Sequence, residues 1–204
     1  MDEKMNEIII ESAKLFRQYG VRSVSMEDIA RAMGVSKKTL YQYVSNKNDL
    51  VEKILDYTYQ REVALLEECT QNDVNAIDAL LKMSQLISEE VKLFTPTVTF
   101  DLKKYYPETF RKHVEKSQKF AYKAVSRNLH QGIAQGLFRE EINAEVVATL
   151  YINKIEDVHD EDFFKGKEFT FDLIFETMFE NHIRGIANEK GIAYFEKRKN
   201  DYQF

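Results

Sequence analysis

The chain has 204 residues, of which 44% are hydrophobic, enough to build one domain or two small ones around a real core. Seven glycines and two prolines favour long helices over many short strands, so we expect an all-α protein. The longest stretch without a charged residue, Asn128 to Phe138, is 11 residues long and too short to span a bilayer.

The start of the chain reads MDEKMNEIII, which places acids where a signal peptide needs net positive charge. It also lacks an apolar core of adequate length for such a signal. Cys69 is the only cysteine, so no internal disulfide can form and a reducing compartment is expected. The sequence therefore predicts a cytoplasmic globular protein.

Charge is spread unevenly along the chain, whose net charge is −5. Residues 1–60 hold nine basic and nine acidic side chains, whereas residues 61–204 hold 20 and 25. Between Ile29 and Asn48 lie four basic residues and no acid. A local basic surface on an acidic protein attracts a polyanion only where that surface docks.

The first helix is predicted from apolar residues that recur at three- and four-residue steps between Met5 and Tyr19. Gly20 follows the last of them and ends the helix. A short second helix then begins at Ser25, where the hydroxyl caps the helix and Asp28, three residues on, bonds back to it as in a capping box.

The same signals repeat around Ser36. Its hydroxyl caps another short helix that runs to about Val44, and a further helix begins near Asn46. The residues GVS form the turn between the two short helices. Two capped short helices with such a turn predict a helix-turn-helix.

The helix after Ser36 has one buried and one exposed face. A turn of 100° per residue puts Leu40 and Val44 on the buried face, and Lys38 and Gln42 point outward. Around the outward face lie Lys37, Thr39, Tyr41 and Tyr43. These groups can reach base edges or hold phosphates, and Lys47, at the start of the next helix, is placed for a contact to the DNA backbone.

A solvated helix with a few lysines is the alternative interpretation, and it is the better one for any single residue here. It does not account for the conjunction of two capped short helices, an acid-free basic segment and a tyrosine-rich exposed face. The combination favours binding to double-stranded DNA.

Three segments carry a resemblance to a known family: AKLFRQYG, VSMEDIARAMGVS and KKTLYQYVSNKNDL. Together they make residues 8–50 similar to the DNA-binding domain of the TetR family of bacterial transcriptional regulators. The rest of the chain matches that family only in being helical. Many members have glycine at the position of Lys38, so a lysine there changes how closely the backbone can approach DNA.

The resemblance implies two domains and a set of DNA contacts. Residues 1–48 would form the helix-turn-helix domain, and residues 49–204 a helical domain for effector binding and dimerisation, with about nine helices in all. Phosphate contacts are implied for Ser25 and Lys47. The full set of predicted DNA-binding residues is Ser25, Arg31, Ser36, Lys37, Lys38, Thr39, Tyr41, Gln42, Tyr43 and Lys47.

The stretch FTPTVTFDLKKYYPETF contains both prolines, Pro96 and Pro107, and five aromatic residues. A short aromatic helix packed among longer ones is suited to line a ligand cavity, and in the family this region lines the effector pocket. The alternative is that these rings only fill the core. The residues predicted to line the pocket are Met83, Phe100, Tyr105, Phe120 and Tyr151.

The last predicted helix, residues 166–188, carries an apolar stripe broad enough to suggest a partner subunit, since such a patch would be a liability if exposed. Packing within its own domain is the alternative. In the family, the last two helices pair across a two-fold axis. The predicted dimer residues are Phe171, Ile174, Phe175, Met178, Phe179 and His182.

A helical-bundle metal protein is the competing class. Glu156 and His159 form an E-x-x-H pair, but di-iron bundles need two such pairs and two further glutamates. No phosphate loop, dinucleotide-binding motif, nucleophile elbow or paired CxxC motif is present. We therefore expect no enzyme, no cofactor and no metal.

The sequence thus predicts a homodimeric regulator, in this family usually a repressor, that binds a palindromic operator and is released by a small-molecule effector. An activator or a ligand-independent regulator of the same fold is the alternative.

Overall fold

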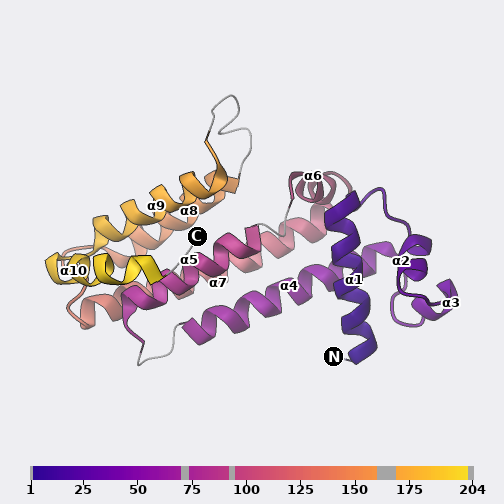
Figure 1. Cartoon of the computed structure of the whole chain (residues 1–204), viewed down its shortest axis with the longest axis horizontal. Coiled ribbons are helices and arrows are strands. Elements are labelled where there is room, and N and C mark those ends of the chain that lie inside the picture. The colour runs from indigo at the N-terminus through magenta and orange to yellow at the C-terminus, as the bar shows by residue number, and fades with distance from the viewer. Residues whose placement is uncertain (1, 70–73, 92–94, 160–168, 202–204) are drawn as a thin grey trace. The chain divides into compact units, whose positions relative to one another are not determined.

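The computed structural model describes residues 2–69, 74–91, 95–159 and 169–201. Within these residues it is built of α-helices with one short 3-10 helix and no strand, which confirms the predicted all-α class (Figure 1). The α-helices are α1 (Glu3–Tyr19), α2 (Met26–Ala32), α3 (Lys37–Leu40), α4 (Lys47–Cys69), α5 (Ala76–Val91), α6 (Pro96–Tyr105), α7 (Pro107–Ala134), α8 (Ala144–His159), α9 (Phe171–Ile186) and α10 (Glu189–Arg198). No helix in the described ranges is long and apolar enough to cross a membrane.

The chain divides into two compact units. The first contains Met1–Glu62 and Leu93–Ser117, and the second contains Val63–Lys92 and Gln118–Phe204. The first unit therefore includes most of α4, the whole of α6 and the start of α7 in addition to the three helices at the start of the chain.

Local signals of the sequence explain how α2 and α3 begin. The Ser25 side chain accepts the backbone N–H of Asp28, and the Asp28 carboxylate accepts the N–H of Ser25, so the predicted capping box is confirmed. The Ser36 hydroxyl accepts the N–H of Thr39 and caps α3 as predicted. Both helices are then fixed by burial, because Ile29 and Leu40 are completely buried in the core of the first unit.

Helix α3 is shorter than predicted. It ends at Leu40, and residues 41–43 form a turn. The N–H groups of Gln42 and Tyr43 bond to carbonyls three residues back, those of Thr39 and Leu40, which tightens the last turn. Val44 is still buried as expected, because this tighter turn keeps its side chain on the inner face.

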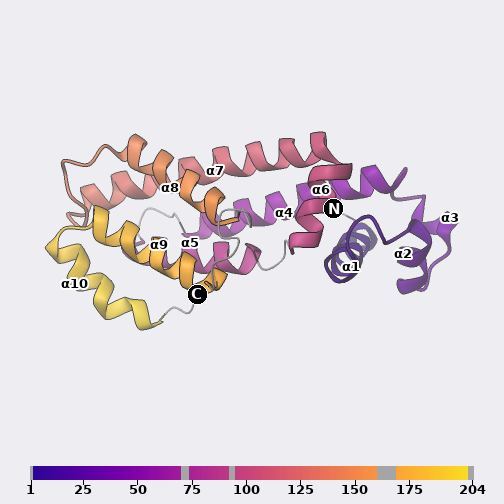
Figure 2. The same ribbon diagram turned by 90° about the horizontal axis from the view of Figure 1, so that it is seen from above.

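The core of the second unit is formed by α5, α7, α8 and α9. Helices α8 and α9 lie side by side in both views (Figures 1 and 2). The start of α5 is held by the amide side chains of Asn128 in α7 and of Gln135, the residue that follows α7. Asn128 donates to the carbonyl of Ala76 (2.8 Å), and Gln135 accepts the N–H of Ala76 (2.8 Å). The bond from Ala76 to Gln135 satisfies one of the N–H donors that the start of a helix leaves unpaired.

Helix α10 is absent from the predicted set, in which the last helix continued to Asn188. Instead Asn188 caps a new helix by accepting the N–H of Gly191 (3.0 Å). The predicted helix also begins later, at Phe171, with Thr170 as its cap. A Cβ at Gly191 would lie 2.1 Å from the carbonyl oxygen of Leu137, so only glycine allows this close approach.

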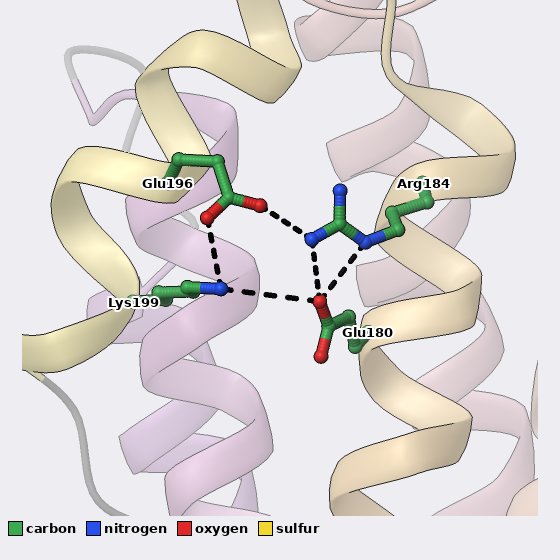
Figure 3. Close-up of polar contacts among 4 residues, drawn as sticks. All are labelled: Glu180, Arg184, Glu196 and Lys199. Atoms are coloured by element: carbon green, nitrogen blue, oxygen red, sulfur yellow. Dashed lines mark hydrogen bonds and ion pairs between the residues drawn. The ribbon is translucent and has the colours of Figure 1, made fainter.

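Four charged side chains join α9 to α10 and to the short 3-10 helix that follows it, Lys199–Asp201 (Figure 3). Arg184 Nε lies 2.9 Å from the Glu180 carboxylate, and the same guanidinium pairs with Glu196. Lys199 completes the group, with its ammonium 2.8 Å from Glu196 and 4.0 Å from Glu180. The side chains of these pairs are 34–40% exposed, so each pair stabilises the contact only modestly.

Tyr151 of α8 and His182 of α9 stack face to face in the second unit, with ring centroids 3.8 Å apart. Tyr151 is buried, and His182 Nε2 is buried without a hydrogen-bond partner among the described residues. Burial lowers the pKa of His182 to about 4, and the charge of Lys154 acts in the same direction. The imidazole is therefore neutral at pH 7.

This burial predicts a pH-dependent stability. Histidine in the unfolded chain titrates near 6.5, so between pH ~6.5 and ~4 the unfolded state binds more protons than the folded state. The free energy of unfolding should therefore fall as the pH drops through this window, by about 2 kcal/mol from pH ~7 to ~5 for this residue alone.

Replacing His182 by phenylalanine keeps an aromatic ring against Tyr151 and removes the titration. Urea unfolding of His182→Phe at the two pH values should show a smaller loss of stability than wild type. His130→Gln is the matched control, because the His130 side chain is 58% exposed. An equal pH dependence in wild type and His182→Phe would refute the assignment.

Candidate nucleic-acid interface

The surface around α3 presents exposed polar side chains above a buried leucine. Lys37, Lys38, Tyr41 and Gln42 are exposed, while Leu40 directly beneath them is fully buried. The predicted outward direction of these four is therefore confirmed. A buried anchor with exposed polar neighbours holds the backbone and leaves the side chains free to adapt to base edges.

Two of the predicted contacts between Ser36 and Tyr43 are less accessible than the others. Thr39 is half-buried, and its hydroxyl lies 2.8 Å from that of Ser36. Tyr43 is also half-buried and packs against the core of the first unit. Ser25 is exposed, but its hydroxyl donates to the Asp28 carboxylate (2.6 Å). This bond, with a backbone bond, lowers the pKa of Asp28.

The cations of this surface differ in their partners. In the described part of the chain, Lys37 and Lys38 have no carboxylate within ion-pair distance. Arg31 is 73% exposed and lies 3.5 Å from Glu27 and 3.8 Å from Asp28. Exposed pairs of this kind contribute little, so all three cations can exchange water for phosphate at small cost.

Lys47 lies in a more enclosed position than the sequence indicated. It is half-buried, and its ammonium donates to the carbonyl of Arg22 (3.3 Å) and lies 5.7 Å from the centre of the Phe16 ring. Burial lowers the pKa of Lys47, while the carboxylates of Asp101 and Asp28 act against this shift.

Sequence reasoning missed a contact between α6 and the corner that follows α1. The Asp101 carboxylate accepts the N–H of Arg22 (2.8 Å), and the Arg22 guanidinium donates to the Tyr105 hydroxyl (2.6 Å). The signal was present: Asp101 falls on the same face of α6 as the buried residues Val98 and Leu102. An acid on such a face calls for a partner.

The residues predicted to line an effector pocket are divided between the two units. Met83 and Tyr151 are buried in the second unit, and Phe120 is half-buried there. Phe100 is 58% exposed on α6 of the first unit, where Tyr105 bonds to Arg22 instead. Lys104 lies over both of these rings, 5.2 and 5.6 Å from their centres.

Two surface hollows are lined by other residues. One is formed mainly by side chains of α1, including Ile10, together with Met33, and the other by side chains of α9 from Leu173 to Arg184.

The residues of α9 that were predicted to contact a partner subunit differ in their burial. Phe175 and Phe179 are completely buried, so for these two the prediction was wrong: they pack within the chain because they fall on the inner face of α9. His182 is directed inward to Tyr151. Phe171, Ile174 and Met178 are half-buried.

The exposed apolar residues of the last helices lie on a different face. Val146 and Leu150 of α8 are 52% and 58% exposed, and Leu173 of α9 is 51% exposed. The E-x-x-H pair of Glu156 and His159 lies outside the residues whose side chains are described. Among the side chains that are described, no three of histidine, cysteine, aspartate and glutamate gather as a metal site.

Comparison with known proteins supports the reading of the amino-terminal residues. Residues 8–54 match the family model of bacterial regulatory proteins of the tetR family. The chain is 26% identical over 184 residues to the HTH-type transcriptional regulator YvaF of Bacillus subtilis, an alignment that covers 90% of this chain and 95% of YvaF. It is 21% identical over 151 residues to the HTH-type transcriptional repressor KstR2 of Mycobacterium tuberculosis, covering 72% and 75% of the two chains.

Solved structures have the same fold. The ketosteroid transcriptional regulator KstR2 of M. tuberculosis superposes with a TM-score of 0.59 at 18% identity, over 93% of this chain and 97% of that one. The fatty acid degradation regulator FadR of Bacillus halodurans gives 0.67 at 15% identity, over 89% and 95%. At this identity the likeness is one of fold.

The family model, the relatives and the fold agree with the geometry of α2 and α3. Proteins of this group are transcriptional regulators and not enzymes, and they bind DNA as dimers with small-molecule ligands. Residues 8–54 are thus a DNA-binding domain of the TetR family, and the chain that carries it is a transcriptional regulator.

Proposed function

We propose that the protein is a cytoplasmic repressor that binds a palindromic operator as a homodimer and leaves it when a small molecule binds. The observation that carries this proposal is the exposed, acid-free surface of α3, fixed from below by the burial of Leu40. A rigid base with unpaired cations suits docking into the major groove of DNA.

The contacts divide by chemistry. Lys37, Lys38 and Gln42 are exposed and carry groups that bond to base edges, with Thr39 and Tyr43 beside them. Arg31, Tyr41 and the hydroxyls of Ser25 and Ser36 suit phosphate oxygens, as does the half-buried Lys47. Phosphate contacts hold the protein in register, and base contacts choose the sequence.

Arg31 tests the phosphate role. Replacing Arg31 by alanine should weaken binding to all duplexes by a similar factor, because a phosphate contact carries no sequence information. Each copy of the proposed dimer loses one phosphate contact, so the plot of log K against log salt should flatten by about two units. Fluorescence anisotropy over a salt series, with an operator found by selection from random duplexes, measures both effects.

Arg111→Ala is the matched control. Arg111 is also an exposed arginine between two helix carboxylates, 2.9 Å from Glu108 and 2.6 Å from Glu115, and it lies outside α1–α4. It should leave the salt slope unchanged. A change in base preference with an unchanged slope in Arg31→Ala would remove the phosphate assignment.

The dimer is proposed to form through the outer faces of α8 and α9. Val146, Leu150 and Leu173 are each more than half exposed, and large apolar side chains on adjacent helices are costly to leave in water. A second copy related by a two-fold axis would cover them and form a four-helix bundle. Two copies of α3 would then reach half-sites about one DNA turn, ~34 Å, apart.

Leu150 tests this interface. A glutamate at position 150 would place a charge in the proposed bundle, so light scattering of Leu150→Glu should give the mass of one chain, and operator affinity should fall with it. The matched control is Phe100→Glu, because Phe100 is equally exposed at 58% but lies on α6. A monomeric wild type, or a dimeric Leu150→Glu, would refute the proposed face.

The effector is proposed to bind in the second unit beside Tyr151 and His182. The imidazole nitrogen Nε2 is buried and has no hydrogen-bond partner among the described residues, and the Ser88 hydroxyl is likewise buried without one. Such groups cost free energy unless a ligand or water satisfies them. A neutral imidazole in an apolar core favours an uncharged ligand with a hydrogen-bonding group.

A further inference from the structure

Asp101 is a buried carboxylate that lies within the first unit and belongs to none of the predicted sites. It is 7% exposed, and its Oδ2 accepts the backbone N–H of Arg22 (2.8 Å). A buried carboxylate needs such bonds to remain charged. The bond joins α6 to the corner between α1 and α2. Its two residues, Arg22 and Asp101, are 79 positions apart in the sequence.

The fit between α6 and this corner is close. Gly20 has a φ of +83°, a conformation that side chains rarely adopt, and a Cβ there would lie 3.0 Å from Asp101 Oδ2 and 3.1 Å from Thr97 Cγ2. Two features therefore require glycine at position 20: the backbone conformation of the turn that ends α1, and the close approach of the Asp101 carboxylate. The carboxylate rests directly against the backbone of the corner.

The same corner holds Lys47. The carbonyl of Arg22 accepts from the Lys47 ammonium (3.3 Å), so Arg22 bonds to Asp101 through its N–H and to Lys47 through its carbonyl. The ammonium also feels the negative charge of Asp101, together with that of Asp28. Asp101 thus stabilises the position of Lys47 in two ways, by fixing the carbonyl that Lys47 binds and by attracting its charge.

The Lys47 ammonium needs these interactions because it is partly removed from solvent. The ammonium is half-buried beside the Phe16 ring, and burial of a charge without partners is costly. A lysine on a flexible four-carbon stem can otherwise adopt many rotamers, most of which point away from any one phosphate. A lysine held in one rotamer loses less entropy on binding.

We propose that Asp101 is a positioning residue for DNA binding, whose buried carboxylate fixes the Arg22 corner and holds the Lys47 ammonium ready for a backbone phosphate of the duplex. This inference rests on the proposed function of Lys47 as a phosphate contact. It adds a residue of α6 to the machinery of the helix-turn-helix.

The sign of the effect separates this role from simple electrostatics. Removing a negative charge from a DNA-binding protein should strengthen its attraction to a polyanion. If Asp101 positions Lys47, removing its charge should instead weaken binding. Asp101→Asn is the informative variant, because its amide oxygen can still accept the N–H of Arg22 while the charge is lost.

The experiment measures operator affinity for Asp101→Asn in the wild-type chain and in a Lys47→Met background. Asp101→Asn should lose about tenfold in affinity, the lower end of what one hydrogen bond to a charged group contributes, and should lose none when Lys47 is already absent. The matched control is Glu140→Gln, an equal change of charge at an exposed residue for which no contact with a described residue is known.

Three outcomes are decisive. Equal or tighter binding by Asp101→Asn would overturn the proposal, and so would a loss that persists in the Lys47→Met background. A wild type that binds no duplex would refute the proposed function itself and is thereby distinguished from failure of this inference.

A measurement without DNA completes the test. Asp101 acts to raise the pKa of Lys47, so NMR titration of the Lys47 side chain should give a lower pKa in Asp101→Asn and an unchanged one in Glu140→Gln. An unchanged circular dichroism spectrum of Asp101→Asn would show that the variant is folded. The shift in the pKa of Lys47 could then not be attributed to unfolding. An unshifted Lys47 would contradict the proposed coupling.

Discussion

The burial of Leu40 is the constraint on which the candidate interface depends. Helix α3 has four residues, and a helix of that length cannot form alone, because nucleation costs more than one turn of hydrogen bonds returns. The Ser36 cap supplies one bond, and the complete burial of Leu40 supplies most of the rest. The surface residues of α3 can thus be chosen for their partner, since they are not needed to hold the helix.

Much of the first unit could be predicted because its signals are local. The caps at Ser25 and Ser36 and the inward Leu40 follow from side-chain chemistry within four residues. The bond between Asp101 and Arg22 could not be predicted in the same way, because its partners are far apart in sequence. A polar residue on an apolar face shows that a partner exists but does not identify it.

The packing of the second unit was harder to predict from the sequence, because its contacts also join distant residues. The apolar stripe of α9 was visible, but its periodicity could not say whether the covering surface came from the same chain or another. Phe175 and Phe179 turned out to be covered by their own chain, whereas Leu173, which the stripe omitted, is exposed. Helix α10 was missed because its capping residue, Asn188, follows the last residue of α9 after a single residue, with no proline or long loop to separate the two helices.

The composition of the first unit has a consequence for exchanging DNA-binding heads between regulators. Val98 and Leu102 of α6 complete the hydrophobic core into which Phe16 and Leu50 pack. A chimera that joined only residues 1–48 to the ligand-binding domain of another regulator would lack the α6 side chains of that core. It would also lack Asp101, the acceptor of the Arg22 N–H. The unit that can be transferred is therefore discontinuous in sequence. A chimera that keeps the DNA specificity of this protein must contain α6 as well as α1–α3.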